Sequence, residues 1–147
     1  MFPMQQIHIS FSGRRLFFRT CGSGPLLFML HPSPQHSGRM EGLMTVFADH
    51  FQVVAPDTPG YGLSEAIEPA PRELSDYCVF IEAIRQYLAA PSFYLYGTAT
   101  GAQLAIAYAL AYPEKVKFLF LDNAAHFNNN QRDEILQNYF ISIHPED

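Results

Sequence analysis

The 147-residue sequence has no tryptophan, only two cysteines and few charged residues, which make up 16% of the chain. Its nine Lys and Arg are outnumbered by fourteen Asp and Glu. The sequence therefore lacks the basic cluster with which proteins bind nucleic acids or anionic membranes. No apolar run approaches the ~20 residues that span a bilayer, and residues 1–11 lack the basic start of a signal peptide. We therefore expect no nucleic-acid partner, no membrane partner and a cytoplasmic location.

Cysteine and histidine spacings give no sign of a metal site. Cys21 and Cys78 lie far apart, which favours two reduced thiols in a reducing compartment. The six histidines also lack metal-ligand spacing, and the glycine-rich loops lack the lysine of a phosphate-binding loop. We expect no metal and no cofactor.

The hydrophobic content of 48% excludes disorder, and the length predicts one domain. Short apolar runs alternate with segments of helical periodicity. Strands are expected over 7–11, 16–19, 25–30, 51–55, 92–96 and 116–121, and helices over 37–49, 73–89 and 102–111. The first two strands form a hairpin around Gly13. The later alternation predicts an α/β fold, a mostly parallel sheet with helices on both faces.

The most specific motif is Gly97-Thr98-Ala99-Thr100-Gly101, between an expected strand and an expected helix. In a nucleophile elbow the chain turns so sharply that small residues are needed two positions before and after the centre. The central side chain then faces a pocket, as does the next backbone N–H. Both glycines are present, but the centre is Ala99, which has no nucleophilic atom.

With this motif the sequence resembles the α/β-hydrolase superfamily, and three more motifs extend the likeness over residues 7 to 126. The first, Leu30-His31-Pro32-Ser33-Pro34, is similar to the family's His-Gly-x-Pro oxyanion loop. The second, the segment from Asp57 to Ser64, is similar to its D-x-x-G-x-G-x-S loop. The third, Pro113-Glu114-Lys115-Val116, is similar to the P-E-R-V sequence that leads into the family's sixth strand. Pro32 stands where the family has glycine.

The resemblance implies roles for particular residues. The oxyanion donors are the backbone N–H groups of Ser33 and Thr100, and Asp122 is a weaker candidate for the catalytic acid. The hydroxyls of Thr98 and Thr100 are expected to point away from the pocket mouth. The candidate binding residues, in loops at one end of the sheet, are His31, His36, Asp57, Thr98 and His126. Of these, His31 is expected to order the oxyanion loop and Asp57 to brace its own loop.

The family's sheet has eight strands, with the catalytic histidine after the eighth. The resemblance thus implies that residues 1–127 are the N-terminal half of a core domain and that 128–147 begin a helical cap or an exposed tail, with a helix over 131–141. We expect the fold to be truncated after the sixth strand and first cap helix. The completing part would be a missing C-terminal half or a second chain, with a homodimer as one option.

The sequence leaves open whether this chain is an enzyme. The leading interpretation is an α/β-hydrolase-like protein with a small-molecule pocket above Ala99 but no elbow nucleophile, either a natural pseudo-hydrolase or a half-enzyme that needs a completing chain. One alternative is an inactivated variant or fragment of a hydrolase that cleaves carboxylic esters, amides or C–C bonds. A second is a non-catalytic ligand-binding or partner protein. A third is an enzyme using His or Asp for acid–base chemistry.

Overall fold

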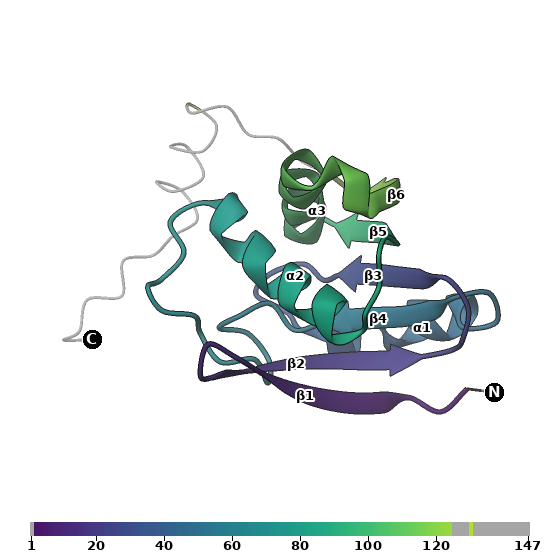
Figure 1. Ribbon diagram of the computed structural model, residues 1–147. Coiled ribbons are helices and arrows are strands. Elements are labelled where there is room, and N and C mark those ends of the chain that lie inside the picture. The colour runs from purple at the N-terminus through teal and green to yellow at the C-terminus, as the bar shows by residue number, and fades with distance from the viewer. Residues whose placement is uncertain (1, 125–129, 131–147) are drawn as a thin grey trace, which may run out of the picture.

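The structure, a computed structural model, describes residues 2–124 and 130. Residues 2–124 form one sheet flanked by helices (Figure 1). The strands are β1 (Gln5–Phe11), β2 (Arg14–Cys21), β3 (Leu26–Leu30), β4 (Gln52–Pro56), β5 (Phe93–Thr98) and β6 (Val116–Asp122). The helices are α1 (Glu41–Phe47), α2 (Cys78–Tyr87) and α3 (Thr100–Ala111), with short 3-10 helices η1 (Ser37–Met40), η2 (Leu74–Tyr77) and η3 (Pro113–Lys115).

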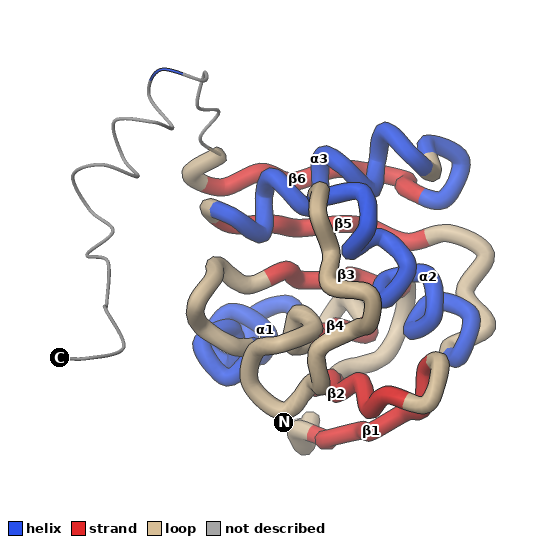
Figure 2. Tube along the Cα trace, turned by 90° about the vertical axis from the view of Figure 1, so that its left-hand side faces the viewer, coloured by secondary structure: helices blue, strands red, loops and turns tan. Residues whose placement is uncertain are grey.

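The sheet has the strand order β1-β2-β4-β3-β5-β6, which can be followed from the bottom to the top of Figure 2. The opening hairpin β1–β2 is antiparallel, as is its junction with β4, whereas β4, β3, β5 and β6 run parallel. The expected α/β class is therefore confirmed. Because the four parallel strands end at the same edge of the sheet, the loops that follow them are brought together there.

Two apolar clusters cover the two faces of the sheet. Helices α2 and α3 pack on one face, where the largest buried side chains include Phe28, Phe93 and Tyr108. Helix α1 packs on the other face, over Met29, Val53 and their neighbours. Helices thus cover both faces, as expected. Every residue of β3 is buried, which explains its unbroken apolar run.

Several boundaries differ from those expected. The helix predicted over 37–49 begins as η1, and α1 ends at Phe47. The helix predicted over 73–89 begins as η2, where Glu73 and Asp76 form a reciprocal capping box. The predicted helix over 131–141, His126 and nearly all of the 128–147 segment lie outside the described residues.

Cys21 and Cys78 are free and buried, and burial raises the pKa of the Cys78 thiol to about 11. A search of residues 2–124 and 130 finds no helix with the length and hydropathy needed to cross a bilayer.

Candidate functional site

The strand-to-helix turn at Ala99 has the strained backbone of an elbow. Ala99 adopts φ 50° and ψ −117°, a conformation that side chains disfavour. It lies directly between β5 and α3, and its N–H donates to the carbonyl of Asp122 at 3.0 Å. The sharp turn predicted from the motif is present, and the side chain at its centre is a methyl group.

Close backbone contacts explain the two glycines of the motif. A Cβ on Gly97 would lie 2.4 Å from the carbonyl oxygen of Gly101. A Cβ on Gly101 would lie 2.3 Å from the carbonyl oxygen of Leu30. Both separations are far below van der Waals contact, so the first turn of α3 can approach β3 and β5 only where side chains are absent.

The two residues expected to form the oxyanion hole contact each other. The backbone N–H of Ser33 donates to Oγ1 of Thr100 at 2.6 Å. The Thr100 hydroxyl was expected to point away from the pocket mouth; instead it lies against the oxyanion loop, because that loop folds over the first turn of α3. In this arrangement the Ser33 N–H is already engaged, and the hydroxyl hydrogen of Thr100 remains able to donate to a ligand.

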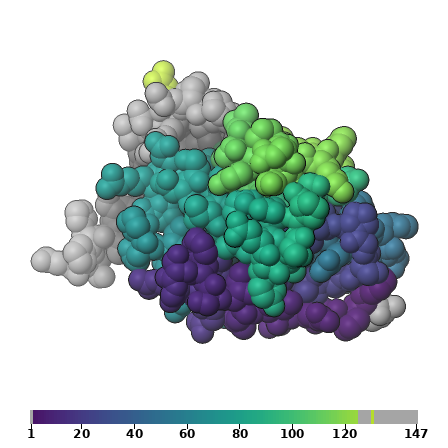
Figure 3. All heavy atoms as spheres, viewed as in Figure 1, coloured from purple at the N-terminus to yellow at the C-terminus, as the bar shows by residue number. Residues whose placement is uncertain are grey.

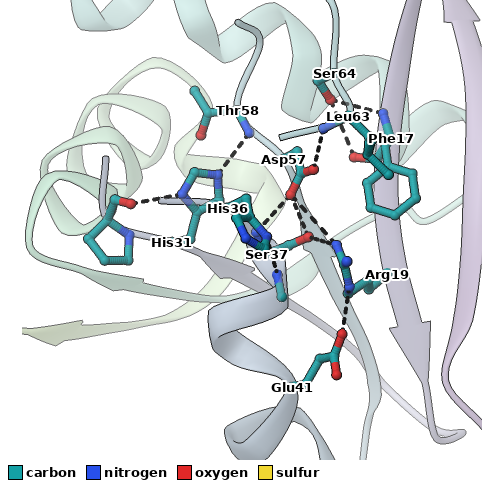
Figure 4. A network of polar contacts seen from close by, with 12 residues as sticks. Phe17, Arg19, His31, His36, Ser37, Glu41, Asp57, Thr58, Leu63 and Ser64 are labelled. Carbon is teal, nitrogen blue, oxygen red and sulfur yellow. Dashed lines mark hydrogen bonds and ion pairs between the residues drawn. The ribbon is translucent and has the colours of Figure 1, made fainter. Parts of the chain in front are cut away.

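His31 ties the oxyanion loop to the loop after β4 (Figure 4). Its ring is 1% exposed, with Nδ1 3.0 Å from the carbonyl of Pro32 and Nε2 3.0 Å from the backbone N of Thr58. A neutral ring with its hydrogen on Nδ1 satisfies both contacts. Burial lowers the pKa of His31, although the bond to Pro32 acts in the opposite direction. Both contacts support the expected ordering role.

Asp57 is buried at the end of β4 and holds two loops together. One carboxylate oxygen accepts from the backbone N and Oγ of Ser37, at 2.7 and 2.5 Å. The other accepts from the backbone N of Leu63 at 2.8 Å. This geometry supports the expectation that Asp57 braces its own glycine-rich loop, and it adds a bond to the segment that opens η1.

Sequence reasoning missed Arg19, which completes this polar network (Figure 4). The side chain is nearly buried and donates to Ser37 Oγ at 2.7 Å and to Glu41 Oε1 at 2.8 Å. Its guanidinium also lies 3.9 Å from Asp57 and 4.9 Å from the ring centroid of Phe17. An arginine in an alternating strand predicts a solvent-facing position. Only the pairing of β2 with β4 brings it over the buried carboxylate.

Asp122 and Thr98 lie opposite each other at the ends of β6 and β5. The Asp122 carboxylate accepts from the Tyr96 hydroxyl at 2.9 Å and from Thr98 Oγ1 at 3.4 Å. Burial, followed by the bond to Asp122, raises the pKa of Tyr96. Thr98 thus turns toward Asp122, and the carboxylate is held beside the elbow by two hydroxyls.

The remaining candidate, His36, caps a short helix, and several of the other candidates line a cavity. His36 is exposed, and its Nδ1 accepts from the Gly38 N–H at 3.1 Å, which caps η1. A cavity of about 200 Å³ lies beside the elbow, lined among others by His31, Ser33, Tyr61, Tyr77, Thr100 and Leu104. Ala99 does not line it. In the described part of the chain no three His, Cys, Asp or Glu side chains gather as a metal site would require.

A mostly parallel sheet in which strand β5 enters helix α3 through a strained, glycine-flanked turn defines an α/β-hydrolase type of protein. The family model described as "alpha/beta hydrolase fold" matches residues 25–141. The chain therefore belongs to this family.

Individual relatives are hydrolases of differing substrates. The chain is 34% identical over 99 residues to a 2-(acetamidomethylene)succinate hydrolase of Mesorhizobium japonicum, covering 67% of this chain and 35% of that protein. It is 32% identical over 108 residues to a pimeloyl-[acyl-carrier protein] methyl ester esterase of Nitrosospira multiformis, covering 72% and 41%. Among solved structures, Cfl2 of Burkholderia cenocepacia superimposes with a TM-score of 0.81 at 25% identity, covering 97% of this chain and 53% of Cfl2. The chain spans less than half the length of these curated relatives.

Proposed function

We propose that this chain is a pseudo-hydrolase: it binds a small carbonyl-bearing molecule at the elbow and forms no covalent intermediate there. The observation that carries this proposal is the methyl group of Ala99 at the strained centre of the turn. Covalent catalysis needs an oxygen, sulfur or carboxylate at that point. Without one, the groups that remain at the elbow can orient a ligand but cannot attack it.

The groups beside Ala99 favour an oxygen-bearing ligand. In the first turn of α3 the N–H groups of Ala102 and Gln103 donate to the carbonyl of Ala99, so the donors nearest the ligand are the N–H groups of Thr100 and Gly101. The helix dipole adds positive potential at this end of α3. The Thr100 hydroxyl, polarised by the Ser33 N–H, supplies a further donor at the mouth of the 200 Å³ cavity. A carboxylate, ester or amide oxygen matches these donors. Both curated relatives described above are named for substrates that carry such groups.

A completing polypeptide is the second part of the proposal. Residues 2–124 end their sheet at β6, and the apolar side chains of that strand are left exposed. The missing portion of a hydrolase fold, supplied by a second chain or by further sequence, would cover this edge and would enclose the space in front of Ala99. In this arrangement residues 1–127 are one half of a core domain, and 128–147 lead into a cap.

The binding proposal is tested by thermal denaturation with a panel of short carboxylates, amides and p-nitrophenyl esters. A ligand at ten times its dissociation constant adds about 1.4 kcal/mol to stability, so at least one member should raise the melting temperature without being hydrolysed. Thr100→Val should abolish that shift. Thr45→Val, which removes an exposed hydroxyl from α1, is the matched control and should keep it. Ester turnover by the chain, or no shift with any compound, would contradict the proposal.

A second candidate function is supported by the strain at Ala99. Holding a non-glycine residue at φ 50° and ψ −117° costs about 1–3 kcal/mol of stability. The methyl group of alanine has no reactive atom that would make use of this conformation. The geometry is thus what an inactivated variant of an ester, amide or C–C bond hydrolase would retain after losing its nucleophile. On this alternative, a serine at position 99 restores an attacking group.

Restoring the nucleophile distinguishes the two candidates. Ala99→Ser should react with a fluorophosphonate probe when imidazole is added as an external base, because among the described residues the hydrogen bonds at position 99 involve no histidine. Ala109→Ser, the same change within α3, is the control and should remain unlabelled. Equal labelling of the two variants would mean that the elbow retains no activating geometry, and the inactivated-hydrolase candidate would fail.

A further inference from the structure

The cavity beside the elbow is enclosed by four segments that lie far apart in the sequence. They are the oxyanion loop after β3, the loop after β4, the short helix η2 and the first turn of α3. The first two meet where the ring of His31 bonds to the backbone of Thr58 (Figure 4). Among the described residues that form these walls, none belongs to β6. The shape of the cavity is therefore set by the N-terminal part of the sheet and its loops.

The lining of this cavity is polar but uncharged. None of the described residues that line it is Lys, Arg, Asp or Glu. His31 stays neutral at pH 7, because both of its ring nitrogens are engaged and burial lowers its pKa. Burial, and then the nearby Tyr61, raise the pKa of Tyr77, so that phenol keeps its proton as well. A charged ligand would find no opposite charge in these walls.

Three hydroxyl groups of the lining have no hydrogen-bond partner among residues 2–124. They belong to Thr58, Tyr61 and Tyr77. Every fully buried side-chain nitrogen or oxygen of the described residues does have a partner, so these three oxygens are accessible. Each hydroxyl can donate one hydrogen bond and accept others. Together with the Thr100 hydroxyl, which accepts from Ser33, they suit a ligand that carries both a donor and an acceptor.

We propose that this cavity takes an uncharged ligand of about the size of one aromatic ring, with a carboxamide or similar group, and rejects a carboxylate of the same shape. This inference rests on the proposed ligand site and names the class of molecule that fits it. A carboxamide offers a carbonyl acceptor and N–H donors together. The volume of about 200 Å³ exceeds the ~150 Å³ of a cavity that holds benzene, which leaves room for one small polar group.

The apolar part of the wall suits a ring. Tyr61, Tyr77 and Leu104 all line the cavity, and the ring of Tyr61 stands edge-on to that of His31, with centroids 6.5 Å apart and planes at 74°. Aromatic rings favour edge-to-face and offset contacts of this kind. A flat ligand can therefore contact tyrosine rings while its polar group meets the hydroxyls.

A carboxylate would lose more than it gains in the same place. The N-terminal end of α3 favours negative charge, but the effect of a helix dipole is small beside the cost of taking a carboxylate out of water without a cation to pair it. Asp122, held beside the elbow by two hydroxyls, is itself an anion and adds repulsion. The buried cation Arg19 is already bonded to Ser37 and Glu41 and does not line the cavity.

Benzamide and benzoate test this choice, because they have nearly the same shape and differ in charge at pH 7. NMR titration of the unmodified chain should give a dissociation constant of about 1 mM for benzamide, as for other ligands of this size. Benzoate should bind at least about tenfold more weakly. Tyr77→Phe, which keeps the ring and removes the hydroxyl, should weaken benzamide binding about three- to tenfold. Tyr87→Phe, at a 57% exposed position on α2 outside the cavity, is the control and should leave it unchanged.

A lysine at the rim should change the preference. Leu74 lines the cavity and is 43% exposed, and Figure 3 shows the segment of η2 and α2 (teal) at the surface. Leu74→Lys should strengthen benzoate binding about three- to fivefold, as a partly exposed ion pair would, and leave benzamide binding nearly unchanged. Val79→Lys, at a 39% exposed position outside this cavity, adds the same charge and should change neither.

The outcomes separate this inference from the proposed ligand site. Benzoate binding as tightly as benzamide would overturn the inference and leave the ligand site standing. Benzamide binding that ignores Tyr77→Phe, or equal effects of Leu74→Lys and Val79→Lys on benzoate, would overturn it too, because the ligand would then lie elsewhere. If neither compound binds, the inference fails, and the thermal shifts with the wider panel show whether the proposed ligand site fails with it.

Discussion

Replacing Ala99 by glycine should stabilise this protein, although the same change destabilises almost any helix or strand. The reason is the backbone at position 99, which holds φ 50° and ψ −117°. Glycine adopts positive φ without steric penalty, whereas the methyl group of alanine is crowded there.

The expected magnitude follows from three contributions. Relief of the strained conformation contributes about 1–3 kcal/mol. Greater freedom of glycine in the unfolded chain removes about 0.5–1 kcal/mol, and loss of the partly buried methyl group removes at most ~0.8 kcal/mol. With strain in the upper half of its range, the net stabilisation is about 1 kcal/mol, which corresponds to roughly 3 °C in melting temperature for a chain of this length.

The measurement is urea denaturation followed by circular dichroism, with Ala109→Gly as the matched control. Ala109 lies within α3, where glycine costs about 1 kcal/mol. The two variants should therefore move the unfolding midpoint in opposite directions, about 2 kcal/mol apart in free energy. If Ala99→Gly loses as much stability as Ala109→Gly, position 99 is not strained, and the argument for an elbow fails.

Two further predictions concern the residues around the elbow. Gly101→Ala should unfold the chain or lower its stability by more than about 3 kcal/mol, because its Cβ would lie 2.3 Å from the Leu30 carbonyl oxygen. The control is Gly42→Ala, whose Cβ meets nothing within 4 Å and which should be neutral or stabilising. Equal urea midpoints for the two variants would contradict the close approach of Gly101 to Leu30. Burial lowers the pKa of His31 in the folded state, so the unfolded chain binds the extra proton, and stability should be full above about pH 6.5 and fall as the pH decreases. His31→Gln should be less stable than the unchanged chain at pH 7, but it should lose less stability between pH 7 and 5. The matched variant His50→Gln, at an exposed position, should leave the dependence of stability on pH unchanged. If His31→Gln also leaves that dependence unchanged, the lowered pKa of His31 is refuted as its cause.

Local pattern was sufficient to predict the elements. All six expected strands are present, because an apolar run such as that of β3 can be buried on both faces only within a sheet. The elements differ most from expectation at their ends, as where η1 precedes α1. The end of a helix depends on single hydrogen bonds, such as the one from the Gly38 N–H to the His36 ring at the start of η1. Hydrophobic periodicity does not predict a bond of this kind.

The candidate site was predictable only in part. The motif around Ala99 indicated the strained turn, because a side chain at either glycine would clash with backbone atoms. At Gly97 the clash is with Gly101, a few residues away, and at Gly101 it is with Leu30 on an adjacent strand. The bond between Ser33 and Thr100 joins positions 67 residues apart, and no local pattern indicates it. The position of Arg19 also escaped prediction, because alternation describes only which side of a strand a residue faces.

By itself, then, the sequence determined the α/β class, the elbow and the absence of a nucleophile at position 99, because each depends on residue types at fixed local spacing. Only the tertiary structure decided that Arg19 lies beside Asp57, that the Ser33 N–H donates to the Thr100 hydroxyl, and that β6 is the last strand of the sheet among residues 2–124. Those facts depend on which strands become neighbours, and strand order is set by the packing of the whole sheet.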